Sequence, residues 1–322
     1  MQLIRINSLF LIAVIFLGNS APLEAVIVAG ASGVGSENTA AAGLNSELQT
    51  QFPYYENVVQ VGNGSGVYLG SSGVSGWLIT AKHVSVPSSI AVGGHAYGVN
   101  QTFPVSGADV AIVELNLNVP LGAPGLPSVP MNGGSIAIGS PVVMAGYGRA
   151  RLEGPPKSRN KGDAVPVGGS NLGYHWTAER VMRWGTNEVA ASPSKYYGIE
   201  GGQAVTSVAG VGEAFFTSFD EPTRAYLTTN EAQGSAGDSG GGVFSQNANG
   251  DWELTGIMSQ IYPDAWQEGQ TAAFGNYTLS VYLPVYQSSI SGINGGLSIP
   301  EPRTPVFLLT GCCIWLLLRR RH

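Results

Sequence analysis

The chain has 322 residues, of which 43% are hydrophobic and 11% charged, and it carries a formal net charge of −6. This length and composition allow one large domain or two moderate ones with a buried core, and they argue against a disordered chain. Both ends of the chain are basic, so residues 26–298 are more acidic still. A phosphate backbone would be repelled, and no nucleic-acid partner is expected.

The residue types favour an all-β fold. The chain contains 46 glycines, and β-branched and aromatic residues are spread through it, which is typical of short strands joined by tight turns. Its two cysteines, Cys312 and Cys313, both lie in a hydrophobic segment near the C-terminus. We therefore expect no disulfide and no thiolate metal site in the folded region, and we expect neither a metal nor a cofactor.

Residues 1–25 have the pattern of a secretory signal peptide. Arg5 precedes an apolar run at 9–17, and small residues follow at Ala21 and Ala25, where cleavage is expected. The alternative is a retained membrane anchor, although the run is shorter than the roughly 20 residues that a span needs. The sequence thus predicts export across the inner membrane.

Strand-like segments then follow in chain order. A short strand is expected at 26–28, and after a Gly, Ala and Ser-rich passage to about residue 50 come alternating apolar segments. Four prolines within 120–130 exclude a regular element there, and we interpret them as the crossing between two domains, 26–128 and 129–292. Within 149–215 only a short helix near 177–182 is suggested. The expected strands cover 58–61, 66–69, 75–80, 108–117, 139–148, 252–259 and 277–282.

The tail changes character at residues 293–322. A Gly/Ser spacer and a proline-rich entry lead to a mostly apolar run at 306–318, and three arginines follow it. This order resembles the PEP-CTERM sorting signals of exported bacterial proteins. The resemblance implies at least transient contact with the membrane and a sorting or processing machinery as a partner, with the chain placed in the cell envelope or secreted. A buried C-terminal helix is the alternative.

Chemistry is concentrated in a glycine-rich stretch at 233–242, which contains Ser239. A serine hydroxyl becomes a useful nucleophile only beside a base that takes its proton and amides that hold the developing oxyanion. A histidine occurs just past a predicted strand, in Thr80-Ala81-Lys82-His83, and an acid, Asp109, opens another. The three could form a catalytic set.

Together these segments resemble the chymotrypsin/trypsin family of serine proteases, over about residues 50–290, with the order His, Asp, Ser. The resemblance implies two six-stranded antiparallel Greek-key β-barrels, with a C-terminal helix in addition. It also implies that Ser239 attacks the scissile carbonyl, His83 transfers its proton, and Asp109 orients the imidazole. The amides of Gly237 and Ser239 would form the oxyanion hole, and Asp238 would pair with a buried cation and shape the loop.

The resemblance also indicates the substrate-binding residues. Gln233 stands at the base of the primary pocket where a carboxylate would select Lys or Arg, so such a preference is not expected. Ser259 would pair with substrate backbone through its carbonyl. Ile261 would narrow the pocket wall. The resemblance also places Gln260 and Gly275 among the substrate-binding residues.

Two departures from the family pattern affect stability and activation. Lys82 and Val84 flank His83 in place of the usual Ala and Cys, so apolar packing must brace this loop without a disulfide. Residues 26–30 match the family's activating N-terminus only in part. Cleavage after Ala25 would expose Val26 directly and give an enzyme that is active on export.

The expected function is therefore an exported serine endopeptidase acting on peptides or proteins through an acyl-enzyme. Two alternatives stay open. The barrels could serve as a catalytically silent binding or adhesion module whose cleft is blocked by insertions within 149–230. The same residues could also act as an esterase.

Overall fold

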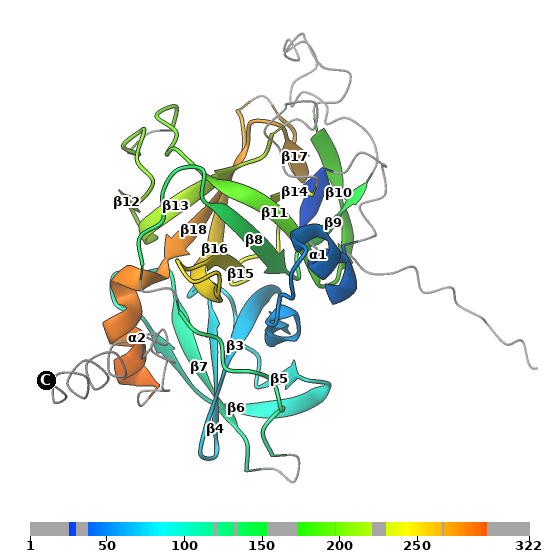
Figure 1. The fold of residues 1–322 in the computed structure, drawn as a ribbon, viewed down its shortest axis with the longest axis vertical. Coiled ribbons are helices and arrows are strands. Elements are labelled where there is room, and N and C mark those ends of the chain that lie inside the picture. Colours follow the sequence, from blue (N-terminus) through cyan, green and yellow to red (C-terminus); the bar gives the residue numbers. More distant parts are fainter. Residues whose placement is uncertain are drawn as a thin grey trace, which may run out of the picture.

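The computed structural model describes residues 26–29, 38–118, 122–131, 134–152, 173–196, 198–220, 230–265 and 267–294. The predicted signal peptide at 1–25 and all but the first two residues of the predicted tail at 293–322 lie outside this part of the chain. The described residues form two β-barrels stacked against each other, with two short α-helices at the periphery (Figure 1).

The first barrel is built from six antiparallel strands. They hydrogen-bond in the order β2-β3-β4-β7-β6-β5, and the end strands β2 and β5 lie against each other. Apolar residues alternate along these strands because one face of each strand is turned into the barrel. The strands are β2 (Val58–Val61), β3 (Gly64–Ser72), β4 (Ser75–Thr80), β5 (Ser89–Val92), β6 (His95–Pro104) and β7 (Ala111–Asn116).

The second barrel contains six antiparallel strands that close into a ring. Five pairings run in the order β11-β8-β15-β16-β18-β13, and the pairing of β11 with β13 completes the circle. The strands are β8 (Pro141–Gly146), β11 (Arg183–Ala190), β13 (Gly212–Ser218), β15 (Gly242–Gln246), β16 (Trp252–Tyr262) and β18 (Tyr277–Tyr282).

Both barrels have the same topology. When the six strands of each are numbered along the chain, the spatial order is 1-2-3-6-5-4 in both, which is a Greek-key arrangement. The expectation of two six-stranded antiparallel barrels is confirmed, and so is the C-terminal helix, α2 (Gln287–Ile293). Ile290 anchors α2 because it is fully buried, which contributes about 1.5–3 kcal/mol.

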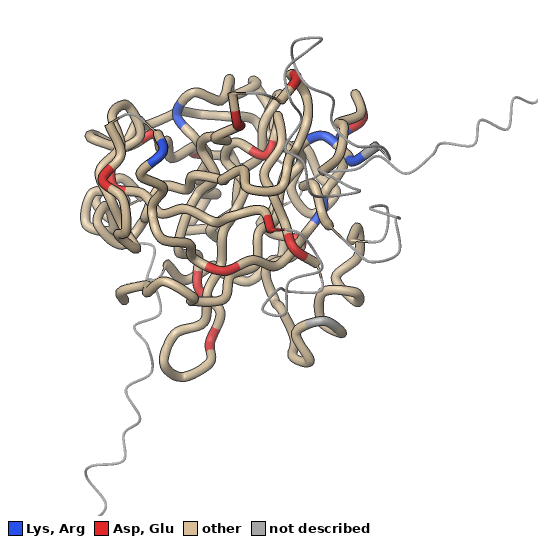
Figure 2. The backbone as a smooth tube through the Cα atoms, turned by 90° about the horizontal axis from the view of Figure 1, so that it is seen from above, with Lys and Arg blue, Asp and Glu red and all other residues tan. Residues whose placement is uncertain are grey.

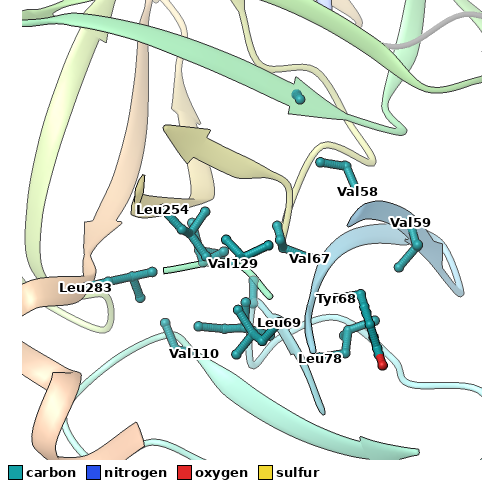
Figure 3. Close-up of a cluster of buried hydrophobic side chains, with 14 of the residues drawn as sticks. Val58, Val59, Val67, Tyr68, Leu69, Leu78, Val110, Val129, Leu254 and Leu283 are labelled. Carbon is teal, nitrogen blue, oxygen red and sulfur yellow. The ribbon is translucent and has the colours of Figure 1, made fainter. Parts of the chain in front are cut away.

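One continuous apolar cluster joins the barrels. Figure 3 shows side chains of β3 facing Leu254 of β16 and Leu283 of the 3₁₀ turn η2 (Leu283–Tyr286), with Val129 of the proline-rich crossing between them. All four elements therefore bury residues in the same core. Packing of this kind fixes the two barrels relative to each other, and a site made from both can be rigid.

The N-terminal strand belongs with the second barrel. β1 (Ile27–Ala29) pairs antiparallel with β14 (Glu231–Gln233), which joins the sheet of β11. The predicted boundary at residue 26 assigned this strand to the first barrel, but the structure places it beside the glycine-rich stretch of the second. At the opposite edge of the sheet, β12 (Thr206–Val208) pairs with β13.

One local prediction is wrong. The suggested helix at 177–182 is instead the end of a strand, β10 (Gly173–Arg180), which pairs with β9 (Arg149–Leu152) and β17 (Thr271–Ala273) in a separate three-stranded sheet. Long-range pairing decided the outcome over local helix preference. Conversely, the Gly, Ala and Ser-rich passage contains a helix, α1 (Ala41–Leu48), which buries Leu44. A second 3₁₀ turn, η1 (Tyr55–Asn57), leads into β2.

None of the helices in the described ranges is both long and apolar enough to span a membrane. Charged positions are scattered around the described fold and not gathered on one face (Figure 2). The distribution of charge over the described residues therefore indicates no particular surface for a partner.

Candidate active site

His83 follows β4 in a loop that three contacts hold in place. Val84 is buried in the shared core, and its amide donates to the Ala81 carbonyl at 3.0 Å. The Lys82 ammonium donates to the Ala108 carbonyl at 3.0 Å. Apolar packing and a lysine hydrogen bond thus take the place of the missing disulfide, and they place His83 next to Asp109.

Asp109 is buried just before β7 and binds His83 twice. Its Oδ2 lies 2.7 Å from His83 Nδ1, and its Oδ1 accepts the His83 backbone amide at 3.2 Å. The hydrogen bond to Asp109 raises the pKa of His83 above its ordinary value, against a lowering by burial. Burial would raise the pKa of Asp109, but hydrogen bonds from His83 and Ser259 outweigh burial and lower it. The carboxylate is therefore ionised at neutral pH.

Ser259, on β16, has a role that the sequence reasoning missed. Its hydroxyl donates to Asp109 Oδ2 at 2.6 Å. Only its carbonyl was expected to matter, for substrate backbone. A serine hydroxyl on a strand carries no signal in sequence that it will meet a particular carboxylate 150 residues away.

Ser239 lies between β14 and β15, with its hydroxyl next to Ser259. Ser239 Oγ donates to the Ser259 carbonyl at 3.5 Å, and within the described ranges it makes no hydrogen bond to His83. The residue Ser259 thus contacts both Asp109 and Ser239. The three predicted triad residues converge on one place, with the Ser239 hydroxyl turned toward Ser259 of the second barrel.

Two backbone amides beside Ser239 have unused donor capacity. Neither the Gly237 nor the Ser239 N–H donates to another group in the described part of the chain. Gly237 has φ +107°, and a Cβ at this position would come within 3.1 Å of the Tyr147 carbonyl, so only glycine is accommodated. Free amides beside a hydroxyl are the arrangement an oxyanion hole needs.

Asp238 is buried and organises the loop. Its carboxylate accepts the amides of Ser235 at 2.7 Å and of Gly148 at 2.8 Å, and also the Ser235 hydroxyl. The backbone of Val26 is a further hydrogen-bond partner. Burial raises the pKa of Asp238 to about 6 although these hydrogen bonds lower it. Within the described ranges no cation reaches this carboxylate, whereas the resemblance led us to expect one.

The residues expected to bind substrate lie on β16 and in the turn before β18. Ile261 pairs with Thr278 across β16 and β18, and Gln260 pairs with Leu279. Gly275 lies in the turn before β18, where its amide donates to the Phe219 carbonyl.

Thr278 packs beside the glycine-rich stretch. It is buried, and its hydroxyl accepts the Gly234 amide at 2.9 Å. A Cβ on Gly234 would lie 3.1 Å from the Thr278 methyl carbon. Gln233 is buried, with Nε2 3.4 Å from Asn276 Oδ1. Strand β18 and the turn before it therefore contact both Gly234 and Gln233.

Comparison with known proteins gives structural likeness only. No protein-family model and no curated protein matches the sequence. Kallikrein-related peptidase 10 superposes with a TM-score of 0.45 at 16% identity, over 74% of this chain and 95% of that one. The inactive form of a Ser-to-Ala mutant of Rv3671c from M. tuberculosis H37Rv gives 0.42 at 14% identity, over 84% and 98%. The HtrA-type protease AlgW with a decapeptide gives 0.39 at 16%, over 71% and 51%.

The chain has a chymotrypsin-like fold. Two six-stranded antiparallel barrels that share one strand order define this fold. Among the described residues, no group of three or more His, Cys, Asp or Glu side chains is arranged to hold a metal ion.

Proposed function

We propose that this protein is a serine endopeptidase in which His83, Asp109 and Ser239 form the catalytic triad. The observation that carries the proposal is the hydrogen bond between the buried carboxylate of Asp109 and His83 Nδ1. With its proton on Nδ1, neutral His83 presents Nε2 as an acceptor and can serve as a general base.

The mechanism follows from this arrangement. The Ser239 hydroxyl turns from the Ser259 carbonyl toward Nε2 of His83, since catalytic hydrogen bonds often form only when substrate is bound. Ser239 Oγ attacks the scissile carbonyl as His83 takes its proton, and the amides of Gly237 and Ser239 hold the oxyanion. His83 then passes the proton to the leaving amine. Water then attacks the acyl carbonyl while His83 takes its proton, and the bond between Ser239 Oγ and the acyl group breaks as His83 returns the proton to Ser239.

Labelling with a fluorophosphonate probe tests this proposal. The probe should modify the wild-type chain and leave Ser239→Ala unmodified, because it reacts with activated serine hydroxyls. Ser245→Ala is the control, since Ser245 is a buried serine of the same barrel whose hydroxyl contacts Thr255 on the neighbouring strand. Cleavage of a casein or peptide mixture by the wild type alone would separate a peptidase from an esterase.

A second candidate function is a catalytically silent binding module. The observation that favours it is the orientation of Ser239, whose hydroxyl contacts Ser259 and not His83. Absence of Ser239-dependent labelling at any pH from 6 to 9 would support the binding module over the peptidase.

We also propose that the chain is exported and reaches the cell envelope through its terminal segments. The support is sequence pattern: the signal-peptide order at 1–25, and the apolar run at 306–318 followed by arginines. Sorting or processing machinery would act on the tail. Cell fractionation tests this: removing residues 299–322 should shift the protein from the membrane fraction to the soluble exported fraction. An unchanged distribution would contradict it.

A further inference from the structure

Ser65, on β3 of the first barrel, is fully buried and contacts the nucleophile loop of the second barrel. Its amide donates to the Ser239 carbonyl at 2.8 Å, and its hydroxyl donates to the Gly237 carbonyl at 2.7 Å. The two residues whose amides would form the oxyanion hole are thus both held, through their carbonyls, by one residue of the other barrel.

The contact with Gly237 determines how one peptide plane is oriented. The peptide between Gly237 and Asp238 is held at its N–H, which donates to the Ser235 carbonyl at 3.1 Å, and at its C=O by Ser65. Because the peptide is planar, these two contacts set the ψ angle of Gly237. Gly237 has no side chain to restrict rotation and has φ +107°, so its backbone depends on such contacts.

Two further hydrogen bonds orient Ser65 itself. The Tyr147 amide donates to Ser65 Oγ at 2.8 Å, so the hydroxyl proton is directed toward Gly237. The Thr80 hydroxyl donates to the Ser65 carbonyl at 2.6 Å. Since Thr80 ends β4, three residues before His83, Ser65 connects the base-bearing loop of one barrel with the nucleophile loop of the other.

We propose that Ser65 is a positioning residue that fixes the backbone from Gly237 to Ser239, and with it the place of the two amides that would face the oxyanion. This inference rests on the proposed peptidase function, because an aimed amide matters only if an oxyanion forms. Ser65 itself does not touch the substrate. Without its hydroxyl, the buried carbonyl of Gly237 loses its partner, and the peptide that follows Gly237 can rotate toward another acceptor or donor.

The kinetic test compares Ser65→Ala, Ser65→Thr and the control Ser245→Ala in the full chain, with p-nitrophenyl acetate as the probe. We expect Ser65→Ala to lower kcat about tenfold to hundredfold, somewhat less than the 10²–10³ lost with a complete oxyanion donor. KM should stay within about threefold, because ground-state binding does not use the oxyanion hole. Ser65→Thr retains a hydroxyl and should recover most of the loss.

The structural test is independent of activity. In a crystal structure of Ser65→Ala, the peptide between Gly237 and Asp238 should be rotated, and the amides of Gly237 and Ser239 displaced, relative to the wild type. Amides that keep their place would overturn the proposal, as would an equal loss of kcat in Ser245→Ala. If the wild type hydrolyses no ester but the amides are displaced in Ser65→Ala, the positioning role stands and the peptidase function fails.

Discussion

The hydroxyl of Ser259 and Nδ1 of His83 bind the same carboxylate oxygen, Asp109 Oδ2, at 2.6 and 2.7 Å. Asp109 precedes a strand of the first barrel, whereas Ser259 lies on a strand of the second. The orientation of the imidazole therefore depends on contact between the barrels. A loss of that contact should affect catalysis before it affects folding.

Ser259→Ala tests this dependence. Hydrogen bonds to charged groups contribute about 1.5–3 kcal/mol, so kcat/KM should fall roughly tenfold to hundredfold. The pKa of Asp109 should rise, because one of the hydrogen bonds that lower it is gone. Steady-state kinetics and carboxyl ¹³C NMR would measure the two effects. Activity equal to wild type in Ser259→Ala would show that His83 is held without the second barrel.

The pH dependence of activity should follow His83. Only the neutral imidazole accepts the serine proton, and the contact with Asp109 raises the pKa of His83 above its ordinary value of about 6.5. The value of kcat/KM should therefore rise with pH and reach half its maximum above pH 6.5. In Asp109→Asn the midpoint should move to lower pH, and kcat should fall about 10⁴-fold, as in other triads. A midpoint that does not move would show that Asp109 is not part of the catalytic triad.

The buried carboxyl group of Asp238 leads to a prediction about which residue forms the mature N-terminus. Its pKa of about 6 reflects a buried carboxyl with hydrogen bonds but no counter-charge, and the backbone of Val26 already contacts it. Cleavage after Ala25 would convert this backbone group into a charged amine. The chain that begins at Val26 should then be more stable at pH 7 than the same chain with its amine acetylated, by about 2–3 kcal/mol.

The sign of the pH effect follows from the raised pKa. In the acetylated chain, the stability contribution of neutral Asp238 is complete below pH 4 and is lost as the pH rises through about 6. The free amine should prevent that loss until it deprotonates near pH 8. Urea unfolding between pH 4 and 8 would measure the difference, and Asp238→Asn should abolish it. A mature N-terminus well downstream of Val26, in fully active protein, would refute the scheme.

The fold could be predicted because its signals are local. Short alternating segments and glycine-rich turns mark strands, and the motifs around His83 and Ser239 stand beside them. The pairing of Ile261 with Thr278 could not be predicted, because it depends on a bulge in β16 between Met258 and Gln260. A bulge shifts the partners of all later residues along the strand, and no residue type in the sequence marks where it occurs. Contacts between the two barrels, such as that of Ser65 with Gly237, could not be predicted from the sequence either.

Substrate preference is the last property that the structure allows us to predict. Ile261 and Thr278 are directly paired, and Thr278 lies against Gly234, so the proposed peptidase should prefer small side chains such as Ala or Ser before the scissile bond. Ile261→Ala should increase the kcat/KM ratio of Phe over Ala substrates at least tenfold. Thr278→Ser should act in the same direction but more weakly, since it removes a methyl group and keeps the hydroxyl that accepts the Gly234 amide.

A series of peptide p-nitroanilides that differ only at the residue before the scissile bond would measure these ratios. Ile138→Ala is a suitable control, because Ile138 is 52% exposed and lies outside the β16–β18 pair that forms the wall. The wild type should cleave the Ala and Ser members fastest. Preference for Phe or Lys in the wild type, or an Ile261→Ala profile that matches Ile138→Ala, would contradict a pocket closed by Ile261 and Thr278.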